Sequence, residues 1–98
     1  MFNTTSGYAV ENARMINFLA IVGDLSHTLH EAGVKYAMKL DIEESELVYG
    51  ILEVISNSDD VNVFEHTFRR ADGCTYRKIS EGQYYLRIKF LLADTTHQ

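Results

Sequence analysis

The chain has 98 residues, of which 46% are hydrophobic and 23% are charged, and its formal net charge is −5. This composition excludes a disordered chain, and the length suits one domain, residues 1–98, with flexible tails at residues 1–8 and 94–98. The single cysteine excludes an internal disulfide and indicates a reducing compartment, so we expect a cytoplasmic protein. No apolar run approaches the ~20 residues of a membrane span, and residues 1–10 do not resemble a signal peptide, so we expect no membrane contact.

A helical pattern of apolar residues begins near Val10. These residues recur at spacings of three and four, which places them on one side of a helix. They are Met15, Phe18, Leu19, Val22, Leu25 and Leu29. Gly33 follows them and suits the left-handed residue that ends many helices. Residues 34–41 then alternate between apolar and polar types, which predicts a first strand.

Residues 41–55 predict a second helix. Asp41 and Glu44 have the spacing of a capping box, and acidic residues suit the positive end of a helix. The expected core face consists of Leu47, Val48, Ile51, Leu52, Val54 and Ile55. Gly50 inside a helix costs ~1 kcal/mol relative to alanine. We therefore expect a close contact at Gly50, either within the fold or across an interface.

Residues 61–70 predict a strand whose buried face the sequence does not decide. Val61 and Val63 would lie on one face, whereas Phe64 and Phe68 would lie on the other. A β-bulge or a twist in the middle of the strand could bring the two sets together. Both orientations of this strand therefore stay open.

Two further strands are predicted after it. Asp72-Gly73 has the residue types of a tight hairpin turn, which would lead into a strand at residues 74–79. Glu81-Gly82 predicts the next turn. Residues 84–92 then show strict alternation over nine residues. One face of that strand would carry Tyr84, Leu86, Ile88, Phe90 and Leu92, and we expect this face to be buried.

These elements predict an α+β domain in the order α-β-α-β-β-β. The two helices are expected to pack on one face of a largely antiparallel sheet of three or four strands. The last three strands are expected to form an antiparallel meander. The strand at residues 34–41 would either pair at an edge of this sheet or lie elsewhere.

No catalytic or cofactor motif is present in the sequence. His27 and His30 are three residues apart, but neither an HExxH motif nor a third ligand accompanies them. We interpret His66 as a structural histidine and Cys74 as a free, accessible thiol, because neither has an evident catalytic partner. We therefore expect no catalytic, metal-binding or cofactor-binding residues, and a protein that is not an enzyme.

Charge is distributed unevenly along the chain. Residues 1–60 hold ten acidic and three basic residues, whereas residues 61–98 hold four acidic and six basic residues. The acidic residues around the predicted second helix are Glu43, Glu44, Glu46, Glu53, Asp59 and Asp60. Such a surface would favour a basic partner. We therefore predict a small protein-binding protein, an inhibitor or adaptor of viral or mobile-element type, which forms a homodimer through leftover apolar side chains.

The alternative is a nucleic-acid-binding module that uses the C-terminal strands. Cations would contact phosphates and aromatic rings would stack on bases. The candidate residues are Arg69, Arg70, Tyr76, Arg77, Lys78, Tyr85, Arg87 and Lys89. The acidic net charge and the missing RNP motif argue against this alternative.

Overall fold

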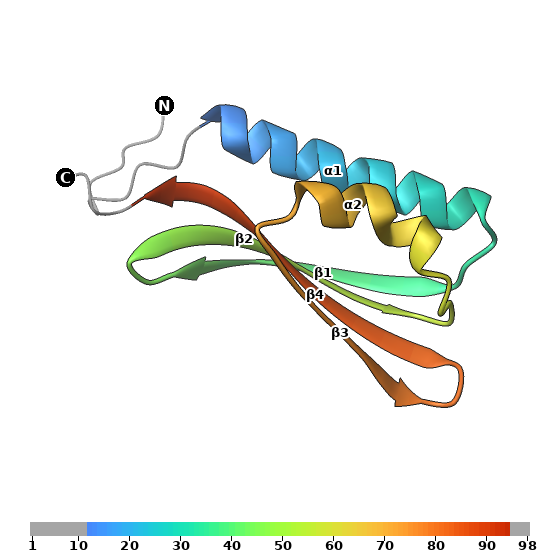
Figure 1. The fold of residues 1–98 in the computed structure, drawn as a ribbon. Helices are drawn as coiled ribbons and strands as arrows, with labels where there is room; N and C mark the ends of the chain where they lie inside the picture. The colour runs from blue at the N-terminus through green and yellow to red at the C-terminus, as the bar shows by residue number, and fades with distance from the viewer. Residues whose placement is uncertain (1–11, 95–98) are drawn as a thin grey trace.

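Two helices lie on one face of a four-stranded antiparallel sheet in the computed structural model, which describes residues 12–94 (Figure 1). The elements are α1 (Asn12–Glu31), β1 (Tyr36–Glu44), β2 (Leu47–Ser56), the 3₁₀ turn η1 (Val61–Phe64), α2 (Glu65–Arg70), β3 (Gly73–Ser80) and β4 (Gln83–Asp94). Neighbouring strands follow the order β1-β2-β4-β3. The α+β class and the two layers are confirmed, whereas the chain order is α-β-β-α-β-β. Of the predicted tails, residues 1–8 and 95–98 lie outside the described residues, and Asp94 instead ends β4.

Helix α1 confirms the first predicted helix. Its buried side chains are those of Phe18, Ile21, Leu25 and Leu29, at helical spacing, whereas Leu19, which was expected on the same side, is 50% exposed. Gly33 has a φ of +71°, and the next N–H, of Val34, donates to the Leu29 carbonyl at 3.0 Å. This is the left-handed helix end that the sequence predicts. The first strand is also confirmed, although it begins and ends later than expected.

The predicted second helix is wrong, because the segment forms a hairpin of β1 and β2. Strand β2 is central and pairs with β1 on one side and β4 on the other. Both faces of β2 carry apolar side chains. The resulting run of apolar residues is also compatible with helical spacing. Four of its ten residues are valine or isoleucine, which favour an extended chain. The predicted capping box at Asp41 does not form, since Asp41 lies within β1.

The predicted strand at residues 61–70 is also wrong, because this segment forms η1 and α2. The Asp60 carboxylate accepts the Asn62 N–H at 3.0 Å and so caps the turn. Phe64 and Thr67 are buried and Phe68 is partly buried. The spacings of three and four residues belong to a helix. Because the apolar residues of this segment follow helical spacing, they could not all lie on one face of the predicted strand.

The C-terminal hairpin of β3 and β4 is confirmed. Its turn contains Gly82, which has a φ of +76°. The predicted hairpin at Asp72-Gly73 is wrong, because Asp72 joins α2 to β3. The Asp72 N–H donates to the Lys89 carbonyl at 2.8 Å, and its carboxylate accepts the Leu91 N–H at 2.7 Å. Asp72 therefore fastens the end of α2 to β4.

The core lies between the helices and what we call the covered face of the sheet. On β2 and β4 this face contains Val48, Gly50, Leu52, Val54, Leu86, Ile88, Phe90 and Leu92. A Cβ atom on Gly50 would lie 2.8–2.9 Å from atoms of the Phe18 ring. That ring also packs on Phe90, with 5.2 Å between ring centroids. The close contact predicted at Gly50 is confirmed, and it joins α1 to the sheet.

Candidate functional site

The opposite face of the sheet carries no helix from residues 12–94 (Figure 1). We call it the open face. Because side chains alternate along a strand, the pairing register assigns every second residue to this face. Its residues are Ala37, Lys39, Asp41 and Glu43 on β1, Tyr49, Ile51, Glu53 and Ile55 on β2, Tyr85, Arg87, Lys89 and Leu91 on β4, and Thr75 and Arg77 on β3.

Acidic and basic side chains lie next to each other on the open face. Glu43 contacts Arg87 at 3.1 Å and Lys89 at 3.6 Å. Glu53 accepts a hydrogen bond from the Tyr85 hydroxyl. The acidic residues come from β1 and β2 and their partners from β4. The two charged regions of the sequence therefore meet within one chain, where their charges partly neutralise each other.

Two tyrosines hold cations on the same face. The Arg77 guanidinium lies 4.9 Å from the centre of the Tyr85 ring, and the Lys89 ammonium lies 4.3 Å from the centre of the Tyr49 ring. Both distances lie within the range of cation–π attraction. These contacts extend the charged network across all four strands and fix the orientation of the tyrosine rings.

A hollow of about 180 Å³ opens on this face where β1, β2 and β4 lie side by side. It is lined mainly by apolar surface, and its residues are Ala37, Met38, Lys39, Glu53, Ile55 and Tyr85. Ile55 is paired with Ala37 on one side and Tyr85 on the other, and 41% of it is exposed. A second hollow of about 370 Å³ also touches Ala37 and Ile55. The open face therefore has an apolar depression within a charged and aromatic rim.

The Glu53 hydrogen bond has a measurable electrostatic consequence. It raises the pKa of the Tyr85 hydroxyl above its usual value, and partial loss of hydration and the Glu53 charge act in the same direction. Arg87 and Arg77 oppose this shift. Tyr85 therefore keeps its proton, and its hydrogen bond, to a higher pH than a free tyrosine.

The acidic residues predicted to bind a protein do not form one patch. Glu43 and Glu53 lie on the open face, and Glu44 and Glu46 lie where β1 turns into β2. Asp59 and Asp60 follow the far end of β2, which at ~3.3 Å per residue is roughly 30 Å from that turn. The predicted acidic helix is wrong, and Asp60 has a local role as the cap of η1.

The basic and aromatic candidates divide between different surfaces. Arg77, Tyr85, Arg87 and Lys89 share the open face. Tyr76 and Lys78 lie on the opposite side of β3, where Tyr76 stacks on Tyr84 with 6.0 Å between ring centroids. Arg69 and Arg70 lie on α2 instead of a strand. Arg69 pairs with Glu65 at 2.6 Å, and Lys78 pairs with Glu81 at 2.8 Å.

The three histidines within residues 12–94 and the cysteine lie apart from the open face. His27 and His30 are exposed on α1, and His66 is exposed on α2, where it contacts Arg70. Cys74 is exposed on β3, as predicted, and desolvation raises the pKa of its thiol. A raised pKa disfavours the thiolate that a nucleophile requires. Among residues 12–94, no group of three or more potential metal ligands of the His, Cys, Asp or Glu type comes together.

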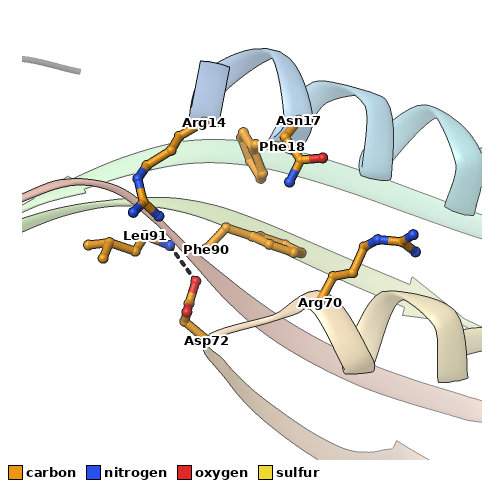
Figure 2. A pocket seen from close by; sticks show the side chains of 7 residues that line it. All are labelled: Arg14, Asn17, Phe18, Arg70, Asp72, Phe90 and Leu91. Carbon is orange, nitrogen blue, oxygen red and sulfur yellow. Dashed lines mark hydrogen bonds between the residues drawn. The ribbon is translucent and has the colours of Figure 1, made fainter. Parts of the chain in front are cut away.

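A separate pocket of about 160 Å³ lies between the helices and β4. Two arginines line it, Arg14 from α1 and Arg70 from α2, but their side chains extend in different directions (Figure 2). Arg14 points toward Leu91, whereas Arg70 points away from Arg14. The Asp72 carboxylate, which holds Leu91, contributes a negative charge to the same pocket. The two guanidinium groups therefore do not converge on an anion.

Comparisons with protein-family models, with curated proteins and with solved structures found no match to this chain. Within residues 12–94, neither helix combines the length and the apolar character needed to cross a bilayer. We therefore base the proposed function on the geometry of the open face.

Sequence reasoning missed Ala37 and Ile55, which line the hollow, and Tyr49, which lies further along the same face of β2. Tyr49, Ile51, Glu53 and Ile55 share a face only if residues 47–56 are interpreted as a strand. The signal that could have found them was Gly50 within a segment rich in β-branched residues, which is typical of a buried strand with a close neighbour.

Proposed function

We propose that this protein acts by protein–protein contact and that the open face is its binding surface. The hollow at Ile55 carries this proposal, because it combines an exposed apolar floor with a charged and aromatic rim. Protein interfaces commonly have an apolar centre, a polar rim, and tyrosine and arginine at the contacts that contribute most.

The side chains around the hollow indicate which kind of partner surface would be complementary to it. An aliphatic side chain of the partner would enter the hollow and contact Ile55 and Ala37, a burial that contributes about 1.5–3 kcal/mol. Acidic groups of the partner would face Arg77 and Arg87, and basic groups would face Glu53, which lines the hollow. The partner surface is therefore an apolar side chain between groups of opposite charge, which differs from the purely basic surface that the sequence predicts.

Binding of this kind is how an inhibitor or an adaptor acts, and we propose this role without catalysis. The cytoplasm remains the proposed compartment, because a single exposed thiol at Cys74 suits reducing conditions. Nucleic acid is the less favoured ligand, since its candidate residues lie on three surfaces and Arg87 and Lys89 already contact Glu43.

The test compares Ile55→Asp with the matched control Ile79→Asp. Both isoleucines lie on strands and have similar exposure, 41% and 47%. Proteins retained from a lysate of the source cells by the wild-type chain should be lost with Ile55→Asp and kept with Ile79→Asp. Ile79 does not line the hollow, so equal retention by both variants would contradict the hollow at Ile55 as the point of contact.

A second experiment distinguishes the nucleic-acid alternative. Fluorescence anisotropy with a labelled single-stranded oligonucleotide should show no saturable binding at physiological salt. Saturable binding that Arg87→Ala weakens and Ile55→Asp leaves unchanged would replace the protein partner with nucleic acid.

A further inference from the structure

Exposed apolar side chains gather along the side of the molecule formed by α1 and β1. Leu40 and Ile42 on β1 are 47% and 43% exposed, and Ile16 and Leu19 on α1 are 67% and 50% exposed. The hydroxyl groups of Ser26 and Tyr36 lie 2.5 Å apart and hold this side of α1 over β1. Leu19 is seven residues, about two helical turns, from Ser26 and therefore lies on the same side of the helix.

The four residues lie beside the core and not within it. Leu40 pairs with Leu52, and Ile42 pairs with Gly50, so both β1 side chains belong to the covered face. Tyr36 and Met38, which share that face, pack against the core, whereas Leu40 and Ile42 extend beyond it. The apolar surface of the core thus continues to the edge of the sheet.

Strand β1 is itself an edge of the sheet, because β2 is its only partner in the described strand order. At its two ends, the Asn57 N–H donates to the Lys35 carbonyl at 3.1 Å and the Ser45 N–H donates to the Leu47 carbonyl at 3.0 Å. Odd-numbered residues therefore direct their backbone groups toward β2. The even-numbered residues from Tyr36 to Glu44 direct theirs outward, where another strand could bond to them.

The charge pattern of β1 fits a second copy of the same strand. Leu40 is the middle residue of the nine in β1. If two copies pair antiparallel about Leu40, the whole strand is used and Lys39 of each copy faces Asp41 of the other. A shift of the centre by one residue places Lys39 opposite Lys39 or Asp41 opposite Asp41, which is unfavourable.

The same register also matches the apolar face. Leu40 would lie opposite Leu40, and Met38 opposite Ile42, with Leu19 of α1 on the same side. The Ile42 N–H, which now donates to the Asp41 carboxylate at 2.8 Å, would instead donate to the other copy. Asp41 would then be available to Lys39 of that copy.

We propose that two copies of this chain associate through antiparallel pairing of their β1 strands about Leu40, which joins the two sheets into one of eight strands. The interface is isologous, since the same residues contribute from both copies. The interface shares Met38 and Lys39 with the lining of the hollow, but it is centred on Leu40 and does not use Ile55. The dimer therefore goes beyond the proposed function and can exist without it.

The test measures the mass of the full chain by sedimentation equilibrium over a range of concentrations. We expect about twice the monomer mass of 11.2 kDa at high concentration. Leu40→Lys should return the mass to that of the monomer, whereas Ile79→Lys should leave the dimer intact, because Ile79 is equally exposed, at 47%, but lies on β3. Circular dichroism establishes that both variants fold.

A charge exchange tests the register. Lys39→Asp and Asp41→Lys should each raise the dimer dissociation constant roughly two- to tenfold, and the double variant should restore it. A monomer at every concentration, a dimer insensitive to Leu40→Lys, or a double variant weaker than either single variant would overturn the proposal. Ile55→Asp should leave the dimer mass unchanged, which separates this result from a failure of the open-face proposal.

Discussion

The two faces of the sheet use the same strands for different purposes. On β2 and β4, Leu52, Val54, Leu86 and Ile88 are fully buried on the covered face. The residues between them, such as Glu53 and Arg87, carry the charged network of the open face. Steps along these strands therefore alternate between buried residues that stabilise the fold and residues of the open face, of which Ile51 alone among those of β2 is also buried. We expect substitutions on the two faces to have different effects on stability.

The largest difference between the faces should appear in alanine substitutions on β2. Leu52→Ala removes a fully buried side chain under the helices and should lower the free energy of unfolding by about 2–5 kcal/mol. Ile55→Ala, on the open face of the same strand, should cost less than about 1 kcal/mol. Urea denaturation measures both. Equal losses would show that the open face is buried in solution.

Glycine substitutions should have opposite signs at two positions. Gly50→Ala places a Cβ atom against the Phe18 ring and should destabilise the fold by about 1–3 kcal/mol. Gly23→Ala, on α1 with no atom within 4 Å of the new Cβ, should stabilise it by up to ~1 kcal/mol. Thermal unfolding measures both changes. Tolerance of alanine at Gly50 would contradict the tight packing of α1 on β2.

Ion pairs on the open face should contribute little to stability. Glu43→Gln removes the contacts with Arg87 and Lys89, but these side chains are 35–42% exposed. We expect a loss of at most about 1 kcal/mol, which decreases as salt is added. The control is Glu81→Gln, which removes the exposed Lys78 pair and should change stability less. A loss of several kcal/mol at Glu43 would mean that the open face determines the fold.

The smallest expected effect is a pH dependence at Tyr85. Its pKa is raised in the folded state, so its contribution to stability is fully present below the ordinary pKa of 10.0 and is lost as pH rises through the folded value. Glu53→Gln should lower the pKa of Tyr85 toward its ordinary value, as measured by NMR titration of the tyrosine ring carbons. An unchanged titration would show that the hydrogen bond does not form.

The sequence predicts the elements with one apolar side better than the strand with apolar residues on both faces. Helix α1 and strand β4 each have one buried side and one exposed side, so their periodicity is clear. Strand β2 lies in the middle of the sheet, and its apolar residues on both faces are compatible with helical spacing. In residues 61–70, Phe64, Thr67 and Phe68 are helical neighbours, but phenylalanine and valine also favour strands. Tertiary context decides both segments.

The sequence predicts the residues of the candidate site less well than it predicts the fold. The contact between Glu43 and Arg87 joins residues 44 positions apart and depends on the register of three strands. Four of the eight basic and aromatic candidates share the open face, whereas the other four lie on the opposite side of β3 or on α2, namely Tyr76, Lys78, Arg69 and Arg70. The acidic residues Glu43 and Glu53 belong to a segment for which the sequence predicts a helix. Their position beside the cations of the open face could therefore not be predicted.

We propose that the hollow at Ile55 contacts a partner protein. A photoreactive phenylalanine derivative at position 55, compared with the same group at position 79, tests this contact in source cells. Crosslinked adducts of one defined mass are predicted from position 55 and not from position 79. No adduct from position 55, or the same adducts from both positions, would contradict the account.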